Sequence, residues 1–161
     1  MDILGQNKTS KEKYYNAHLE WFKRTYPQAW KDNHYSLPMM PPIKKSNGLT
    51  RYIVNVLHWL PKTNGTRVSS AGRLVDGIET GPTGNKIGVK KFIPSTTRRG
   101  TADVTATCSG KSVKWEIKVG ADKPSPYQLA EQKREQEAGG FYFFVHNPDE
   151  YWAQLEEVLS L

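Results

Sequence analysis

Two stretches of alternating residues constrain the fold of this chain most. From 102 to 108 and from 113 to 119, small or apolar side chains alternate with polar or charged ones, which predicts two amphipathic β-strands. Ser109, Gly110 and Lys111 separate the strands, and Gly110 can adopt the positive φ that tight hairpin turns require. We therefore expect an antiparallel hairpin with one apolar face and one polar face.

The polar face of this hairpin gathers three charged residues. A turn around Ser109 and Gly110 sets Asp103 opposite Glu116, whereas a turn centred one residue later sets Asp103 opposite Lys118. All three share one face in both registers, because opposite residues and alternate residues along a strand point to the same side. Two carboxylates this close raise each other's pKa unless a cation compensates their charge. Their oxygen atoms are suited to Mg²⁺ or Mn²⁺.

This group of charges is suited to phosphodiester cleavage. Mg²⁺ is usually held by one or two carboxylates and keeps waters and phosphate oxygens as its other ligands. Such an ion polarises the phosphate and lowers the pKa of a bound water. Lys118 would position that water or stabilise the charge that develops in the transition state. The alternative is a salt-bridged cluster on a solvated sheet face, worth about 0–1 kcal/mol.

Helix and strand signals continue after the hairpin. Ser125, followed by a proline and by Gln128, has the form of a helix N-terminus with a capping box, and Gly139-Gly140 ends the helix. An apolar strand is expected over 141–145, and a terminal helix begins after Asn147. The spacing leaves open whether Gln128 caps the helix alone or also takes part in the site.

The N-terminal part carries two predicted helices. Thr9 and Glu12 have capping-box spacing, and apolar residues recur at helical intervals until Pro27. A proline-rich joint follows at 37–42, and an apolar helical stripe runs over 49–60. Aromatic residues of the first helix are expected to pack on the body, with base stacking as the alternative: Tyr14, Tyr15, Trp21 and Phe22. The predicted units are a helical arm with its linker, 1–43, and the body, 44–161.

The positive charge is concentrated before residue 119. The chain has 23 Lys and Arg against 16 Asp and Glu, a net charge of +7; residues 119–161 hold 3 basic and 8 acidic residues, so they carry −5 and residues 1–118 carry +12. This distribution favours nucleic acid as a partner, then anionic membrane, with a solvated charged surface as the alternative. Short strands are expected at 66–69 and 87–93. The candidate phosphate-binding residues are Arg67, Arg73, Lys90, Lys91, Arg98 and Arg99.

Several classes of protein are excluded by composition. The single cysteine, Cys108, rules out an internal disulfide framework, cysteine-rich zinc sites and iron–sulfur clusters, and it is expected in the core. The four histidines show no ligand spacing, so a metal would be held by oxygen. No stretch approaches the roughly 18 apolar residues of a membrane span, and the first residues lack the form of a signal peptide. We expect a cytoplasmic protein without membrane contact.

A combination of motifs resembles the PD-(D/E)XK nuclease superfamily, in particular VRR-NUC-type and phage or mobile-element nucleases similar to Holliday-junction resolvases. The motifs are Gly100-Thr101-Ala102-Asp103, Glu116-Ile117-Lys118, Ser125-x-x-Gln128, and Gly139-Gly140 before an apolar strand. The resemblance covers about residues 48–145. It implies an α/β fold with a restriction-endonuclease-like core, in which helices flank a central mixed β-sheet, and here an N-terminal helical arm is added.

The resemblance also implies an activity and the roles of individual residues. The activity is that of a Mg²⁺-dependent endodeoxyribonuclease, with Mn²⁺ as a substitute. Branched or junction DNA is a candidate substrate, and a homodimer is a candidate oligomeric state. Asp103 and Glu116 correspond to the metal-binding carboxylates, the carbonyl of Ile117 to a further ligand, and Lys118 to the catalytic lysine. Gln128 corresponds to the glutamine on the helix that follows.

Two departures from the family pattern keep other functions open. The family often places a metal-site glutamate on its first helix, but residues 47–60 contain no acidic residue. Ala102 stands where the family's name has proline, a position that shapes backbone rather than chemistry. The alternatives are a nucleic-acid-binding module with a weak or inactive site, and a module that binds a protein partner through its aromatic arm.

Overall fold

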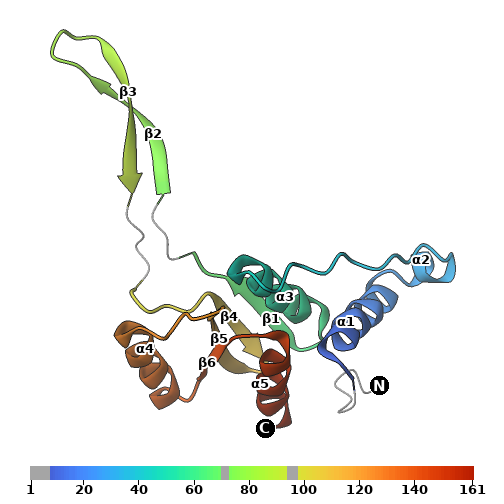
Figure 1. Ribbon diagram of the computed structural model, residues 1–161. Helices are drawn as coiled ribbons and strands as arrows, with labels where there is room; N and C mark the ends of the chain where they lie inside the picture. Colours follow the sequence, from blue (N-terminus) through green and yellow to red (C-terminus); the bar gives the residue numbers. More distant parts are fainter. Residues whose placement is uncertain (1–7, 70–72, 94–97) are drawn as a thin grey trace.

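The computed structural model describes residues 8–69, 73–93 and 98–161 (Figure 1). The helices are α1 (Ser10–Thr25), α2 (Pro27–Lys31), α3 (Ser46–Trp59), α4 (Pro126–Glu137) and α5 (Pro148–Ser160). The strands are β1 (Thr63–Arg67), β2 (Arg73–Thr80), β3 (Lys86–Ile93), β4 (Val104–Cys108), β5 (Lys111–Ile117) and β6 (Phe141–Val145). None of the helices in these described ranges is long and apolar enough to cross a bilayer.

A mixed four-stranded sheet with the order β1-β4-β5-β6 forms the centre of the body. The β4–β5 pair is the predicted hairpin, and Val104 faces Trp115, so the turn lies around Ser109 and Gly110 as in the first of the two expected registers. Both turn residues have positive φ, 48° for Ser109 and 84° for Gly110, as the turns that match strand twist require. β1 pairs antiparallel with β4, and β6 pairs parallel with β5.

Helices cover both faces of this sheet. On the apolar face, α3 and α5 pack against the strands in one core that includes Ile53, Val104, Trp115 and Trp152. The indole of Trp115 donates to Gln154 of α5 at 3.1 Å, which satisfies its one donor inside the core. On the polar face, α4 contacts β6. The expectation of a mixed α/β fold with helices flanking a mixed sheet is confirmed.

Polar contacts attach α4 to the sheet. Lys114 of β5 forms an ion pair with Glu135 at 2.5 Å, and Gln132 donates to the carbonyl of Tyr142 at 3.0 Å. Ser125 accepts from the backbone of Gln128 at 3.3 Å, which completes the predicted N-cap. Because α4 has few buried apolar residues, these polar contacts and the cap determine its position.

The N-terminal helix packs on the body. Thr9 and Glu12 form the predicted capping box of α1. The ring of Tyr14 is fully buried and stacks on Tyr52 of α3, with 4.6 Å between the ring centroids. The hydroxyl of Tyr52 in turn donates to the carbonyl of Ser10 at 2.8 Å. The expected packing of the first aromatic residues, rather than their exposure for base stacking, is confirmed for Tyr14.

The region between β1 and β4 differs most from expectation. The strand expected at 66–69 is β1, which starts and ends earlier, and the strand expected at 87–93 is β3. β2 was not expected; it pairs with β3 along its full length, from Arg73 opposite Ile93 to Thr80 opposite Lys86. Figure 1 shows this β2–β3 hairpin projecting from the body.

Candidate active site

The predicted charged residues meet at one end of the β4–β5 hairpin. Glu116 lies near the end of β5 and Lys118 directly after it, while Asp103 directly precedes β4. A carboxylate oxygen of Asp103 (Oδ2) accepts a hydrogen bond from the backbone N–H of Ile117 at 3.1 Å. Continuing the observed register by one pair sets Asp103 opposite Glu116. The structure thus brings together the residues that the alternating pattern placed on one face.

Glu116 and Lys118 are both buried, with 6% and 3% of their surfaces exposed. The ammonium nitrogen of Lys118 lies 3.4 Å from Oε1 of Glu116, so the buried charges compensate each other. The depth of the pair excludes the solvated salt bridge that the sequence left as an alternative. A charged pair at this depth carries a desolvation cost, which functional sites tolerate more often than purely structural ones.

The pKa of the Glu116 carboxyl lies near neutral pH. Burial first, and then the charge of Asp103, raise its pKa to about 7 against the opposing effects of Lys118 and of the backbone hydrogen bond from Asp103. One lysine therefore does not fully compensate two adjacent carboxylates. Among the described residues, Oδ1 of Asp103 accepts no hydrogen bond, whereas the carboxyl of Glu116 accepts hydrogen bonds from Gln128 and from the backbone N–H of Asp103. Oδ1 of Asp103 is therefore available to a cation.

Gln128 joins the cap of α4 to the site. Its side-chain oxygen accepts from the backbone N–H of Ser125 at 2.8 Å, and its amide nitrogen donates to Oε1 of Glu116. The capping interaction therefore directs the NH₂ group toward the carboxylate. Both interpretations of Gln128 hold: it caps the helix, and it contacts the candidate site.

The structure also orients the backbone of Ile117. Its N–H points toward Asp103, whereas the N–H of the next residue, Lys118, donates to Val145 on the opposite side at 2.9 Å. In an extended strand the N–H and C=O of one residue point to the same neighbour. The carbonyl of Ile117 is therefore on the Asp103 side, in keeping with the ligand role that the resemblance implies.

Two residues near the site were missed in the sequence. Asp122 lies 3.2 Å from the ammonium nitrogen of Lys118, and its side chain is 56% exposed. Tyr142 donates its hydroxyl to the carbonyl of Gly100 at 3.0 Å; burial first, then the charges of Glu116 and Asp103, raise its pKa. The alternation within 141–145 could have placed Tyr142 on the polar face, but Asp122 follows a turn at which the strand pattern ends.

A groove lies beside the charged residues on the polar face of β1, β4 and β5. Its volume is about 260 Å³. Thr105 and Thr107 alternate along β4 with the position of Asp103, so the groove and the carboxylates share this face. Hydroxyl and amide groups of this kind hydrogen-bond phosphate and sugar oxygens. The lining residues are Asn64, Gly65, Thr66, Thr105, Ala106, Thr107 and Ser112.

Three of the candidate phosphate-binding residues lie next to this site. Arg98 forms a 3.5 Å ion pair with Glu131 of α4, and the guanidinium of Arg99 lies 5.5 Å from the centre of the Tyr127 ring. Arg67 lies opposite Val104 in the sheet, and its guanidinium donates to the side chain of Asn47 at 2.8 Å. All three can reach solvent near the two carboxylates.

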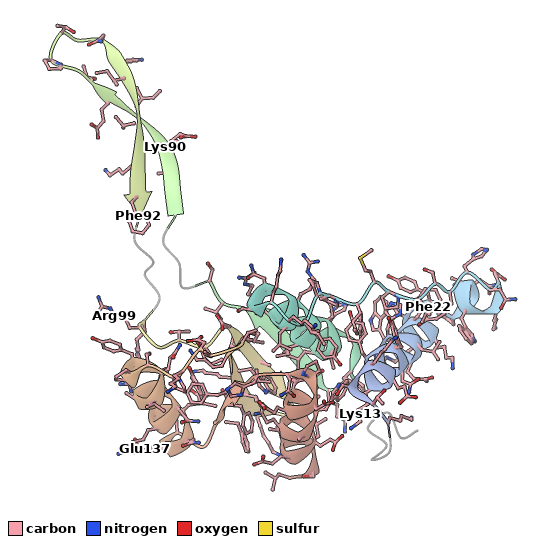
Figure 2. The ribbon with its side chains drawn as sticks, in the orientation of Figure 1. Lys13, Phe22, Lys90, Phe92, Arg99 and Glu137 are labelled. Atoms are coloured by element: carbon pink, nitrogen blue, oxygen red, sulfur yellow. The ribbon has the colours of Figure 1, made fainter. Side chains whose placement is uncertain are left out.

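The other three candidates are on the β2–β3 hairpin and do not join the site. Lys90 and Lys91 are exposed residues of β3, and Arg73 begins β2. Figure 2 shows Lys90 on the projecting hairpin, well separated from Arg99 at the body. The structure therefore divides the six basic residues into a set near the carboxylates and a set on the hairpin.

The site offers few metal ligands, but their oxygen atoms are of the kind that Mg²⁺ prefers. Within the described residues no three His, Cys, Asp or Glu side chains form a group that could hold a metal ion. α3 carries no acidic residue, as its sequence predicts, and Asn47, Thr50 and Arg51 line a second groove along it. Two carboxylates still satisfy the usual requirement of Mg²⁺, which retains waters and substrate phosphate oxygens.

Comparisons of the chain with models of protein families, with curated proteins and with solved structures each find no match. The structure itself shows a mixed α/β fold whose central mixed sheet is flanked by helices. The resemblance to PD-(D/E)XK nucleases rests on the sequence motifs and stays a prediction.

Proposed function

We propose that this protein is a Mg²⁺-dependent endonuclease that hydrolyses phosphodiester bonds in DNA. One observation carries the proposal: Asp103 and Glu116 stand together in a partly buried site in which a single lysine compensates them, and the pKa of Glu116 is raised to about 7. Burying two carboxylates without full compensation is costly. A bound divalent cation would remove that cost, and its charge is what the transfer of a phosphoryl group requires.

The residues that would hold the ion are Asp103, Glu116 and the carbonyl of Ile117. Oδ1 of Asp103 accepts no hydrogen bond among the described residues, the carboxyl of Glu116 lies beside Asp103, and the Ile117 carbonyl is on the Asp103 side of β5. When bound, Mg²⁺ polarises the phosphate and lowers the pKa of a coordinated water. Mn²⁺ shares its preference for oxygen ligands and can substitute for it.

The chain's own residues have distinct roles in this proposal. Lys118 presents a positive charge beside Glu116 and stabilises the negative charge that develops on the phosphate in the transition state. Gln128 donates to Glu116 and holds its carboxylate in place. Asp122 contacts the same ammonium group from the exposed side and orients it. Lys118 is the catalytic residue, whereas Gln128 and Asp122 are positioning residues.

The surroundings support DNA as the substrate. The hydroxyl-lined groove and the basic set near the carboxylates, Arg67, Arg98 and Arg99, offer contacts to the phosphate backbone. The resemblance to PD-(D/E)XK nucleases adds a restriction-endonuclease-like core, branched or junction DNA as the substrate, and a homodimer that acts on two strands. A protein partner bound through the N-terminal arm also belongs to this proposal.

The test is a cleavage assay with Mg²⁺ on linear duplex, single-stranded and four-way-junction DNA. Asp103→Asn, Glu116→Gln and Lys118→Ala should each lower cleavage at least about a hundredfold, the scale of losing one transition-state contact. Glu137→Gln is the matched control, because it removes an exposed carboxylate of α4 that pairs with Lys133 and should leave cleavage close to that of the wild type. Wild-type inactivity on every substrate, or unchanged cleavage by the three variants, contradicts the proposal.

A second candidate function is nucleic-acid binding without cleavage. It is favoured by the small donor set, since α3 supplies no acidic residue to the site. DNA binding by a wild-type protein that cleaves no substrate would support it. If Asp103→Asn, Glu116→Gln and Lys118→Ala each lost DNA binding, the three site residues would belong to the binding surface itself.

A further inference from the structure

The β2–β3 hairpin is an exposed two-stranded ribbon. Each strand has 8 residues, which at about 3.4 Å per residue gives a ribbon about 27 Å long. Its strands pair with each other and form a sheet separate from the central one. Figure 1 shows it extending away from the helices and strands of the body. It therefore contributes little to the core, and packing on the core does not explain why its strands pair over their whole length.

One face of the ribbon combines apolar and basic side chains. The register pairs Asp76 with Lys90, Ile78 with Gly88, and Thr80 with Lys86, so these residues share a face with Phe92. Ile78 and Phe92 are 73% and 59% exposed. Figure 2 shows Lys90 and Phe92 on the hairpin, away from the body. Large apolar groups exposed beside lysines mark a surface that a partner covers.

The charge of the ribbon favours an anionic partner. Residues 73–93 contain four basic residues, Arg73, Lys86, Lys90 and Lys91, and two acidic ones, Asp76 and Glu79, a net charge of +2. Among the described residues no ion pair engages the three lysines. They are free to contact phosphates.

We propose that the β2–β3 hairpin binds duplex DNA by entering its major groove. This inference deepens the proposed function, on which it rests, by naming the element that holds the DNA beside the cleavage site. The major groove of B-DNA, about 12 Å wide, admits a two-stranded β-ribbon. Ile78 and Phe92 contact the base edges and thymine methyl groups. Lys86 and Lys90 from the same face, and Lys91 from the opposite face, contact phosphates of the two strands that border the groove.

The test measures equilibrium binding to a duplex oligonucleotide as a function of salt, without divalent cations and in the Lys118→Ala background. Because no cleavage occurs under these conditions, failure of the proposed nuclease activity leaves the assay intact. The triple variant Lys86→Ala/Lys90→Ala/Lys91→Ala should lower the slope of log K against log salt by about 2.7, or about 0.9 for each lost phosphate contact.

The matched control removes three exposed lysines of the body, as Lys11→Ala/Lys31→Ala/Lys133→Ala. It removes the same number of positive charges, and its slope of log K against log salt should stay close to that of the protein without these substitutions. A second hairpin variant, Ile78→Ala/Phe92→Ala, should weaken binding without changing the slope, because apolar contacts release no counterions. Double-stranded RNA should compete poorly, since its major groove is too narrow and deep for a ribbon.

Several results would overturn the inference. One is a triple hairpin variant that binds DNA like the control variant. Another is an apolar variant with unchanged affinity, or equal competition by double-stranded RNA, either of which excludes insertion into the major groove. A third is a hairpin variant that sediments as a monomer where the wild type is a dimer, with DNA binding unchanged. That result would assign the ribbon to a second copy of the chain.

Discussion

At the scale of single residues, Glu116 connects stability to the chemistry of the site. Burial raises its pKa to about 7, so the folded protein binds a proton there at pH values at which the unfolded chain has released it. The ionised carboxyl therefore costs stability. This cost is absent below about pH 4.5, develops as the pH rises toward 7, and is complete above it.

Replacing this carboxyl by an amide should change the pH dependence of folding. Wild type should lose up to about 3 kcal/mol of unfolding free energy through this group between pH 4.5 and pH 8, at about 1.4 kcal/mol per unit of pKa shift. Glu116→Gln should lack this loss, so the difference in stability between the two proteins should shift by that amount in favour of the variant. Urea denaturation of both proteins across this range measures the difference, with the exposed Glu157→Gln as the control. Added Mg²⁺ should stabilise wild type more at pH 8 than at pH 5, because the ion and the proton compete. Parallel curves for wild type and Glu116→Gln would contradict the raised pKa.

Sequence alone located these residues but did not reveal their environment. The alternation around the turn placed Asp103, Glu116 and Lys118 on one face, because the period of a strand depends on its backbone. Glu116 and Lys118 are nonetheless buried, and α4, which covers the polar face at β6, brings Gln128 into contact with Glu116. A strand pattern contains no information about which helix covers it.

At the scale of elements, the approach of α4 to the sheet depends on one glycine. Gly100 has φ of +85°, and a Cβ on it would lie 2.3 Å from the carbonyl oxygen of Tyr127 in the first turn of α4. The carbonyl of Gly100 accepts from the hydroxyl of Tyr142 at 3.0 Å. The loop that leads into Asp103 is thus held between α4 and β6.

Gly100→Ala should push α4 away from the site. A strained φ together with a clash against backbone should cost about 1–3 kcal/mol of unfolding free energy. Cleavage should also fall, by more than the smaller fraction of folded protein explains, because Gln128 would lose its contact with Glu116. Chemical denaturation and the cleavage assay measure the two effects. Gly110→Ala is the matched control, since Gly110 has nearly the same φ, +84°, and no atom lies within 4 Å of its added Cβ. Equal behaviour of both variants would show that the close approach has no role.

Elements with a buried face were predicted better than those without one. β4, β5 and α3 each pack an apolar side on the core, and their sequences carry the matching period. β2 and β3 have no core to impose an alternation, so β2, with Gly77 and Ile78 at its centre, gave no strand signal. β1 is similarly polar, with the sequence Thr-Asn-Gly-Thr-Arg. These strands form because they pair with a neighbouring strand. Such pairing requires no alternation of apolar and polar residues within the sequence of one strand.

At the scale of the whole molecule, the N-terminal helix contributes to the core of the body. The ring of Tyr14 is buried against Tyr52 and Trp59 of α3, and Lys13 forms an ion pair with Glu156 of α5 at 2.6 Å. α1 is therefore joined to the first and last helices of the body. The arm predicted over 1–43 has its own helix but shares this core.

Removing the ring of Tyr14 should destabilise the entire protein. Tyr14→Ala should cost about 3–5 kcal/mol of unfolding free energy, the range for large aromatic residues in cores. Unfolding should remain a single transition when followed by far-ultraviolet circular dichroism and by tryptophan fluorescence. Tyr26→Ala, which changes a ring that is 47% exposed, should cost much less. A Tyr14 variant that loses α1 but leaves the body's transition in place would make the arm an independent unit.

By itself, the sequence determined the local structure of the hairpin, the capped helices and the grouping of Asp103, Glu116 and Lys118, because these depend on backbone periods and on contacts between near neighbours. The tertiary structure decided the burial of the site and the docking of α1. It also separated the basic residues into a set beside the carboxylates and a set on the β2–β3 hairpin. These features depend on which surfaces meet across long separations in the chain, such as Tyr14 with Tyr52 or Glu116 with Gln128. Such contacts are determined by packing of the whole molecule and not by the pattern of any one segment.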